Sequence, residues 1–305
     1  MTGIPDTTLL TGVYPVIATP FDADGSIDVP SLRRLVEYLI ASGVDGMVVF
    51  GLASELYKLT DDDRRMVLGT VIDAAADRVP VVAGTEHTGF EGAIARSTEA
   101  VHAGAKAVML YPPTFVKPDA QGVEDYYRSI AAAVPVPIVV QDAPNWTGTP
   151  LPIDLLARLR AAASTVGWVK VESLPSAPKV TALRAQGFRA IGGYGAVHLP
   201  EDLDAGVCAI MPGCGIARVY TELWRLYHDG ERDGFWERFT AALPLLSFQM
   251  SSLDLFIAVQ KELLVRTGVF SSGSVRRPGS ALSDYHRSRL DELLVRTGLG
   301  RFLES

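Results

Sequence analysis

The amino-acid sequence predicts an α/β fold, a (β/α)8 TIM barrel with a C-terminal helical extension. Eight short, continuous apolar runs recur along the chain, as expected for parallel strands whose two faces are both buried. Longer amphipathic stretches alternate with these runs, which is typical of βαβ units. A glycine also stands just past four of the predicted helices, where it permits a left-handed C-cap, at Gly43, Gly104, Gly187 and Gly206.

Each element follows from this alternation. The strands are predicted over residues 13–19, 46–50, 79–84, 107–111, 138–141, 167–170, 188–192 and 208–211. The helices between them are predicted over 29–41, 61–76, 90–103, 123–133, 153–162, 177–186 and 200–205. The second helix has the most legible start, because Thr60 can cap it and the aspartates at 61–63 suit the positive end of its dipole.

The alternation stops after residue 211. Only helices are expected from 216 to about 267, and a further helix is expected over 283–297. We therefore predict a barrel over residues 1–230 and a helical extension over 231–305 that packs on it as one structural unit, since no flexible linker separates them. The segment 270–278, rich in serine and arginine, is expected to be an exposed loop.

Composition excludes several classes of function. The net charge of −7 and the lack of a basic run argue against nucleic-acid binding. No run of eighteen apolar residues is present, so no membrane span is expected. The two cysteines suggest no disulfide framework and favour a cytoplasmic location. The five histidines show no metal-ligand spacing, so no metal site is expected.

The most informative stretch is the predicted strand that ends at Lys170, with Glu172 two residues later. Alternate residues of a strand share a face, so both side chains should point the same way. Active sites of barrels lie at the carboxyl ends of the strands, and Lys170 is the only lysine at such an end. A desolvated lysine can form a Schiff base with a carbonyl, and a neighbouring carboxylate can move the proton. The alternative is a structural ion pair at the end of a strand.

Glycines cluster after the seventh predicted strand, at Gly192, Gly193 and Gly195. Such a cluster can bind phosphate, because barrels often do so near strands seven and eight. It can equally allow the backbone to approach a ligand closely, or simply turn tightly.

Several segments resemble one enzyme family. They are Val-Ile-Ala-Thr-Pro-Phe at 16–21 with the Asp-Gly turn at 24–25, the loop 51–55, Val-Ala-Gly-Thr at 82–85, Pro-Pro-Thr-Phe-Val-Lys-Pro at 112–118, and Lys170. Together they resemble the dihydrodipicolinate synthase / N-acetylneuraminate lyase family of class I aldolase-type barrels, over nearly the whole chain. The resemblance places Lys170 on the Schiff-base lysine and implies a homotetramer with no cofactor beyond the covalent imine.

The departures from the family pattern bear on the reaction. Gln141 stands where the family has a catalytic tyrosine, and glutamine cannot relay a proton as a phenol does. Leu52 and Ala53 replace the two threonines that hold a substrate carboxylate. Phe115 stands near the tyrosine that members contribute across a subunit interface, and Trp146 stands at an arginine that synthases use.

One branch of the family, the L-2-keto-3-deoxyarabonate dehydratases, resembles this pattern more closely. The shared features are a Ser-Glu loop at Ser54 and Glu55, the glutamine at 141, and the Lys-x-Glu ending at Glu172. The expected activity is that of a Schiff-base lyase acting on a 2-keto-3-deoxy sugar acid, in particular a dehydratase. Two alternatives stay open, namely a pyruvate-dependent aldolase or synthase and a non-catalytic barrel that binds a keto acid.

Roles follow for the expected site. Lys170 attacks the 2-keto carbon and Glu172 is the candidate base for the C3 proton. Gln141 is the third predicted catalytic residue and is expected to position the carboxylate and the imine by hydrogen bonds. Further residues are expected to bind the substrate or to exclude water from it, and these are Gly51, Leu52, Ser54, Glu55, Phe115, Trp146 and Gly193. The expected partners are a small 2-keto acid and further copies of this chain.

Overall fold

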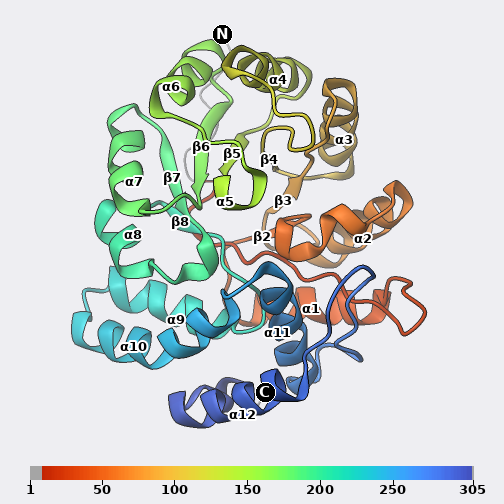
Figure 1. The fold of residues 1–305 in the computed structure, drawn as a ribbon, viewed down its shortest axis with the longest axis vertical. Helices are drawn as coiled ribbons and strands as arrows, with labels where there is room; N and C mark the ends of the chain where they lie inside the picture. The colour runs from red at the N-terminus through yellow and green to blue at the C-terminus, as the bar shows by residue number, and fades with distance from the viewer. Residues whose placement is uncertain (1–8, 304–305) are drawn as a thin grey trace. The chain divides into compact units, whose positions relative to one another are not determined.

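The computed structural model describes residues 9–303, which fall into two compact units. Unit 1 contains Pro80–Met211 and the short stretch that ends at Gly12, and unit 2 contains Val13–Val79 and residues 212–303. Over the described residues, eight strands alternate with helices in chain order (Figure 1). This is the (β/α)8 barrel with C-terminal helices that the sequence predicts. The boundary predicted at residue 230 stays a prediction.

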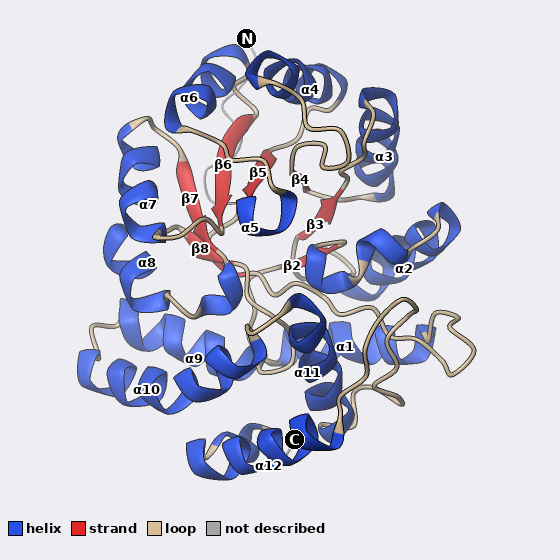
Figure 2. Cartoon of the chain, viewed as in Figure 1, coloured by secondary structure: helices blue, strands red, loops and turns tan. Residues whose placement is uncertain are grey.

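Unit 1 is a parallel sheet whose strands lie on the inner side of its helices (Figure 2). Its strand order is β8-β7-β6-β5-β4-β3. The strands are β3 (Val81–Gly84), β4 (Ala107–Leu110), β5 (Ile138–Asp142), β6 (Val166–Val171), β7 (Arg189–Gly192) and β8 (Ala209–Ile210). The helices are α3 (Phe90–Ala103), α4 (Ala120–Ala133), α5 (Pro144–Thr147), α6 (Ile153–Ala162), α7 (Ser176–Ala185) and α8 (Leu199–Ala205), with a 3-10 turn η3 (Tyr194–Ala196).

The core of unit 1 lies along its central strands. Every residue of β4, β5 and β6 is buried, which explains why these runs are continuously apolar rather than alternating. The parallel register sets Gln141 of β5 opposite Lys170 of β6, and Lys170 opposite Ile191 of β7. Gln141 and Lys170 are 29 positions apart in sequence but are neighbours at one end of the sheet.

Unit 2 is built mainly from helices. They are α1 (Val29–Ala41), α2 (Asp61–Ala75), α9 (Ala217–His228), α10 (Arg232–Gln249), α11 (Leu253–Arg266) and α12 (Asp284–Thr297). Shorter elements are β2 (Met47–Val49) and the 3-10 turns η1 (Leu52–Ser54), η2 (Leu56–Lys58) and η4 (Leu299–Phe302). The predicted cap of α2 is confirmed, because Thr60 Oγ1 accepts a hydrogen bond from Asp63 N at 3.1 Å.

The local signals for the helices are confirmed at other points too. Three helices begin and end at the predicted residues, namely α1, α3 and α6. The four junction glycines all have positive φ, as a left-handed C-cap requires, at Gly43, Gly104, Gly187 and Gly206. Over residues 9–303, no helix combines the length and the apolar character needed to cross a bilayer.

The first strand is far shorter than predicted. Only β1 (Gly12–Val13) is regular, whereas residues 13–19 were expected to form the strand. The backbone then contributes one isolated bridge residue, Val16, which pairs with Val48 and with Gly213. Pro15 explains the interruption, because proline has no N–H to donate to a ladder.

The segment 270–278 is a loop, as predicted, but it is not exposed along its length. Residues 272–276 are half-buried. Arg276 anchors them, since its guanidinium donates to Asp63 Oδ2 at 2.5 Å and to the carbonyl of Gly25 at 2.6 Å. The sequence suggested an exposed loop because arginine is usually exposed. The composition of residues 270–278 could not show that the Arg276 guanidinium lies over the Phe21 ring at 4.5 Å.

Candidate active site

The candidate site in unit 1 is built around Lys170, the penultimate residue of β6. Its side chain is only 4% exposed, because the strand is buried along its whole length. The sequence prediction of a lysine inside a buried strand is therefore confirmed. Burial matters chemically because the surrounding residues fix the position of the amine, so that a carbonyl carbon can be placed next to it.

Glu172 follows the end of β6 and its carboxylate faces the lysine. One oxygen, Oε1, lies 3.3 Å from Lys170 Nζ. The other, Oε2, accepts a hydrogen bond from Gln141 Nε2 at 2.6 Å. The backbone N–H of Tyr194 points to Oε1 at 3.5 Å, a long contact. The structure thus brings together the three residues predicted to be catalytic, Lys170, Glu172 and Gln141.

The glycine at position 193 is explained by the same carboxylate. A Cβ added to Gly193 would overlap Cγ of Glu172 and would lie 3.1 Å from the carbonyl oxygen of Val171. The absent side chain makes room for Glu172 to lie against the backbone. A contact between Gly193 and substrate or phosphate stays a prediction.

A second polar cluster adjoins these residues, and the sequence did not reveal it. Asp142, at the end of β5, accepts hydrogen bonds from Ser173 Oγ at 2.6 Å and from Lys179 Nζ at 2.6 Å through the same oxygen, Oδ2. Its carbonyl oxygen accepts from the N–H of Glu172 at 2.8 Å. The one signal in the sequence was the position of Asp142, directly after Gln141 at the end of a predicted strand.

The arrangement has defined chemical capacities. The lysine amine can add to a carbonyl, and the carboxylate beside it can accept or return a proton close to the new carbon–nitrogen bond. Gln141 holds one carboxylate oxygen and leaves the other facing the amine. Among residues 9–303, no group of three or more His, Cys, Asp or Glu side chains is arranged to hold a metal ion.

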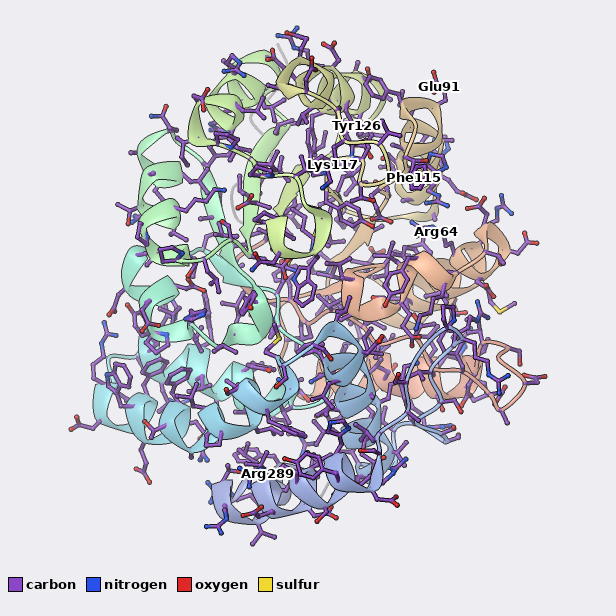
Figure 3. All side chains as sticks on the ribbon, viewed as in Figure 1. Arg64, Glu91, Phe115, Lys117, Tyr126 and Arg289 are labelled. Carbon is purple, nitrogen blue, oxygen red and sulfur yellow. The ribbon has the colours of Figure 1, made fainter. Side chains whose placement is uncertain are left out.

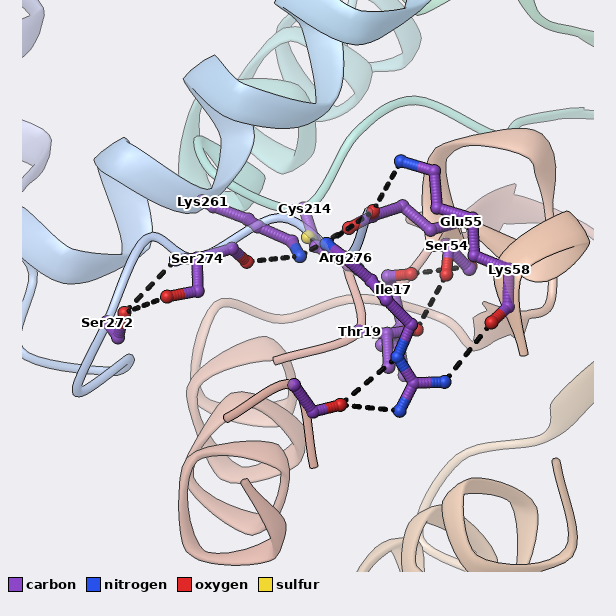
Figure 4. Close-up of polar contacts among 12 residues, drawn as sticks. Ile17, Thr19, Ser54, Glu55, Lys58, Cys214, Lys261, Ser272, Ser274 and Arg276 are labelled. Carbon is purple, nitrogen blue, oxygen red and sulfur yellow. Dashed lines mark hydrogen bonds and ion pairs between the residues drawn. The ribbon is translucent and has the colours of Figure 1, made fainter. Parts of the chain in front are cut away.

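The loop that follows β2 contains three residues predicted to bind substrate, and all three lie in unit 2. Ser54 Oγ donates to the carbonyl of Ile17 at 2.6 Å and accepts from Gly51 N at 3.2 Å (Figure 4). Thr19 Oγ1 donates to the carbonyl of Ser54 at 2.7 Å. The serine hydroxyl is therefore engaged inside the loop, and its predicted contact with substrate stays a prediction, as does that of Gly51.

Glu55 is held by several partners within unit 2 (Figure 4). Its side chain is fully buried and forms an ion pair with Lys261 of α11 through Oε1. The other oxygen, Oε2, accepts from Lys58 Nζ at 2.9 Å and from the backbone N–H of Arg276 at 3.1 Å. Both carboxylate oxygens thus have partners in the protein itself, and the predicted role of Glu55 in substrate binding stays a prediction.

The burial of Lys261, which lies in a segment (260–263) that loosely resembles the dehydratase branch, was not predicted from the sequence. It is fully buried, and burial lowers the pKa of Lys261 from 10.5 to about 8, against the opposing effect of the Glu55 carboxylate. Its ammonium group also donates to the carbonyl of Ser274 at 2.7 Å and lies over the Phe21 ring at 4.3 Å. The available signal was a lysine within the apolar run of α11, which is unusual unless the charge has a partner.

The two aromatic residues expected to exclude water from the site differ in exposure. Phe115 is labelled in Figure 3, and its side chain is 90% exposed in the single chain. Trp146 lies in α5 and is half-buried. The single chain thus does not enclose Phe115, and the shielding role of both residues stays a prediction.

The fold is a (β/α)8 barrel, and a buried lysine–carboxylate pair, Lys170 and Glu172, lies at the carboxyl end of β6. The chain belongs to the dihydrodipicolinate synthetase family, whose model matches residues 9–297, and members of this family are lyases. This confirms the family resemblance found in the sequence.

Individual relatives point to two activities. The chain is 34% identical to L-2-keto-3-deoxyarabonate dehydratase of Azospirillum brasilense, covering 93% of this chain and 96% of the relative. It is 29% identical to 4-hydroxy-tetrahydrodipicolinate synthase of Xanthomonas axonopodis pv. citri, covering 93% of each. Among solved structures, it is similar to YagE, a prophage protein of the dihydrodipicolinic acid synthase family from E. coli in complex with pyruvate. That similarity has a TM-score of 0.88 at 26% identity and covers 95% of this chain and 99% of YagE.

Proposed function

We propose that this protein is a Schiff-base-forming lyase that acts on a 2-keto-3-deoxy sugar acid, and in particular a hydro-lyase that removes water from it. The observation that carries the proposal is the position of the Glu172 carboxylate, 3.3 Å from the Lys170 amine and bonded to the Gln141 amide at 2.6 Å. The dehydratase of Azospirillum brasilense supports the choice of substrate class.

The reaction begins with the lysine. The neutral amine of Lys170 adds to the 2-keto carbon, and loss of one water with uptake of one proton leaves a protonated imine, the proton being returned when the imine is hydrolysed. The imine draws electrons from C3, so that Glu172 can take a proton from that carbon and form an enamine. The enamine expels the C4 hydroxyl as a second water, with the proton that Glu172 gained. Addition of water to the imine then frees Lys170, so that one water is lost overall.

Gln141 favours elimination over carbon–carbon cleavage. Aldol cleavage needs a base that takes the proton from the C4 hydroxyl while the C3–C4 bond breaks. A glutamine amide has no proton that it can exchange in this way near neutral pH. In elimination the same amide has a sufficient role, because it donates to Glu172 and keeps the carboxylate oriented toward the lysine.

Trapping with borohydride tests the imine. The protein is incubated with pyruvate or a 2-keto-3-deoxy acid, reduced, and weighed by mass spectrometry. We expect an adduct on Lys170 that is absent from Lys170→Ala. If the wild-type protein gives no adduct, the chain is a keto-acid-binding barrel at most and the lyase proposal fails.

The products decide between the two lyase activities. A panel of 2-keto-3-deoxy acids of different length and stereochemistry is incubated with the protein, and products are identified by NMR. We expect the dehydrated keto acid, either the 3-ene that elimination leaves or the semialdehyde formed from it when a proton moves from C5 to C3. Release of pyruvate would instead support an aldolase, the activity closer to that of the synthases among the relatives.

A further inference from the structure

Glu172 lies where the regular sheet no longer fixes the backbone. The ladder between β5 and β6 ends with Asp142 opposite Val171, one residue before the glutamate. Beyond that point a carboxylate on a flexible stem can turn in several directions. Besides the contacts of its Oε1 with Lys170 and Tyr194, three hydrogen bonds join the dipeptide at 141–142 to the dipeptide at 172–173, and Glu172 itself makes two of them.

These bonds have separate functions. Gln141 Nε2 donates a hydrogen bond to the carboxylate of Glu172 at 2.6 Å. The backbone N–H of Glu172 donates to the carbonyl of Asp142 at 2.8 Å. The third bond, from Ser173 Oγ to Asp142 Oδ2 at 2.6 Å, fixes the residue that follows. The main chain is thus held on both sides of the Cα of Glu172, and the carboxylate keeps one direction.

The Asp142 side chain is well suited to this task. It is fully buried, and Lys179 from α7 supplies the opposite charge at 2.6 Å. Its second oxygen, Oδ1, is buried without a hydrogen-bond partner within the described part of the chain. Burying a carboxylate is unfavourable unless it is paired, and here Lys179 and Ser173 both pair with Oδ2.

We propose that Asp142 is a positioning residue for the lyase reaction: through Ser173 it keeps the carboxylate of Glu172 beside the Lys170 amine and the C3 atom of the bound substrate. This inference rests on the proposed function. A displacement of about 1 Å can slow a reaction about a hundredfold, so a shift of the Glu172 carboxylate on that scale would be measurable.

Two variants test the bond, with a matched control. Ser173→Ala and Asp142→Ala each remove it, whereas Asp142→Asn keeps an oxygen that can accept from Ser173. Ser176→Ala is the control, because Ser176 Oγ also donates to a buried aspartate, Asp202 Oδ1 at 2.5 Å, close to the start of α7. That bond leads to α8 and not to Glu172.

Two measurements separate positioning from folding. Borohydride trapping of pyruvate on Lys170 reports imine formation. Exchange of the pyruvate methyl protons with deuterium oxide, followed by NMR, reports the proton transfer assigned to Glu172. For Ser173→Ala and Asp142→Ala we expect trapping within about twofold of wild type and exchange slowed by roughly tenfold to a hundredfold. Asp142→Asn is expected to recover most of the exchange, and Ser176→Ala is expected to keep it even where its melting temperature falls.

The possible outcomes are distinct. Unchanged exchange in Ser173→Ala, an equal loss in Ser176→Ala, or a parallel loss of trapping and exchange would each overturn the positioning role while leaving the Schiff base intact. If the wild-type protein forms no adduct on Lys170, the proposed function fails, and the positioning role fails with it. If wild type is trapped but shows no exchange, Glu172 is not the base and Asp142 has nothing to position.

Discussion

The ammonium group of Lys261 and the carboxylate of Glu55, 206 positions apart in sequence, form an ion pair in which both side chains are fully buried. Lys58 and the backbone of Arg276 complete the surroundings of the carboxylate. The lysine needs this partner, because burial alone favours its neutral form. The pair therefore joins the loop after β2 to α11 within unit 2.

Lys261→Met is expected to lower the free energy of unfolding by about 3 kcal/mol, because removing one partner leaves a buried charge less well compensated. The remaining contacts from Lys58 and Arg276 keep the loss at the lower end of the usual range. Urea denaturation measures it. Arg289→Met is the control, because its ion pair with Glu292 is about 40% exposed and is worth less than about 1 kcal/mol. Equal losses in the two variants would contradict the importance of the buried pair.

Asp202 makes stability depend on pH in unit 1. Burial raises the pKa of Asp202 from 3.8 to about 6, although Ser176 donates a hydrogen bond to it. Between these two values the folded state binds more protons than the unfolded state, so that stability falls as the pH rises from about 4 to about 6. Above pH 6 the ionised carboxylate continues to destabilise the folded state.

Asp202→Asn should remove that pH dependence. At pH 7 we expect the variant to be more stable than wild type by about 1–3 kcal/mol, since one pKa unit corresponds to about 1.4 kcal/mol. Denaturation curves at pH 4 and pH 7 check this, and the difference between the proteins should shrink at the lower pH. A variant that is equally destabilised at both values would show that the carboxylate stabilises unit 1 by its contacts alone.

Glu172→Gln should separate imine formation from proton transfer. The amide can still occupy the space beside Lys170 but cannot take the C3 proton, so we expect trapping on Lys170 to persist while turnover falls about 10²–10⁴-fold. Deuterium exchange into pyruvate and product formation from the sugar-acid panel provide the two readings. Glu201→Gln, an exposed acid in α8, serves as the control and should change neither. Unchanged turnover in Glu172→Gln would remove this residue from the mechanism.

Gly193→Ala should displace the same carboxylate by steric means. The new methyl group would overlap Cγ of Glu172, so we expect slower deuterium exchange and slower turnover, with a smaller effect on trapping. Gly69→Ala is the matched control, because Gly69 lies in α2 and a methyl group there meets no atom within 4 Å. That change should stabilise the protein by about 1 kcal/mol and leave catalysis unaltered.

Local signals allowed most of the fold to be predicted. The bounds of α1, α3 and α6 followed from apolar periodicity and helix ends. The length of the first strand was predicted wrongly, because the prediction followed the apolar run and ignored Pro15. Proline has no N–H to donate to a strand ladder. The prediction that residues 270–278 are exposed was also wrong. Arg276 anchors this loop to partners that lie more than 200 positions away in sequence.

The candidate site was predictable where one strand defines it. Alternation along a strand gave the shared face of Lys170 and Glu172, and family resemblance gave Gln141. The hydrogen bond between Ser173 and Asp142 could not be predicted from the sequence, because it depends on the register between β5 and β6 across 31 positions. Sequence patterns describe each strand but not the alignment of one strand with the next.

The double pairing of Val16, with Val48 on one side and Gly213 on the other, has a consequence for synthesis on the ribosome. Unit 2 is assembled from two stretches of chain that residues 80–211 separate. Glu55 is synthesised early, but its partner Lys261 is synthesised 206 residues later. Until then the carboxylate of Glu55 has no buried ion pair and stays hydrated. Residues 80–211 are contiguous and can begin to pair as they leave the tunnel, whereas unit 2 closes only when the last third of the protein has been made.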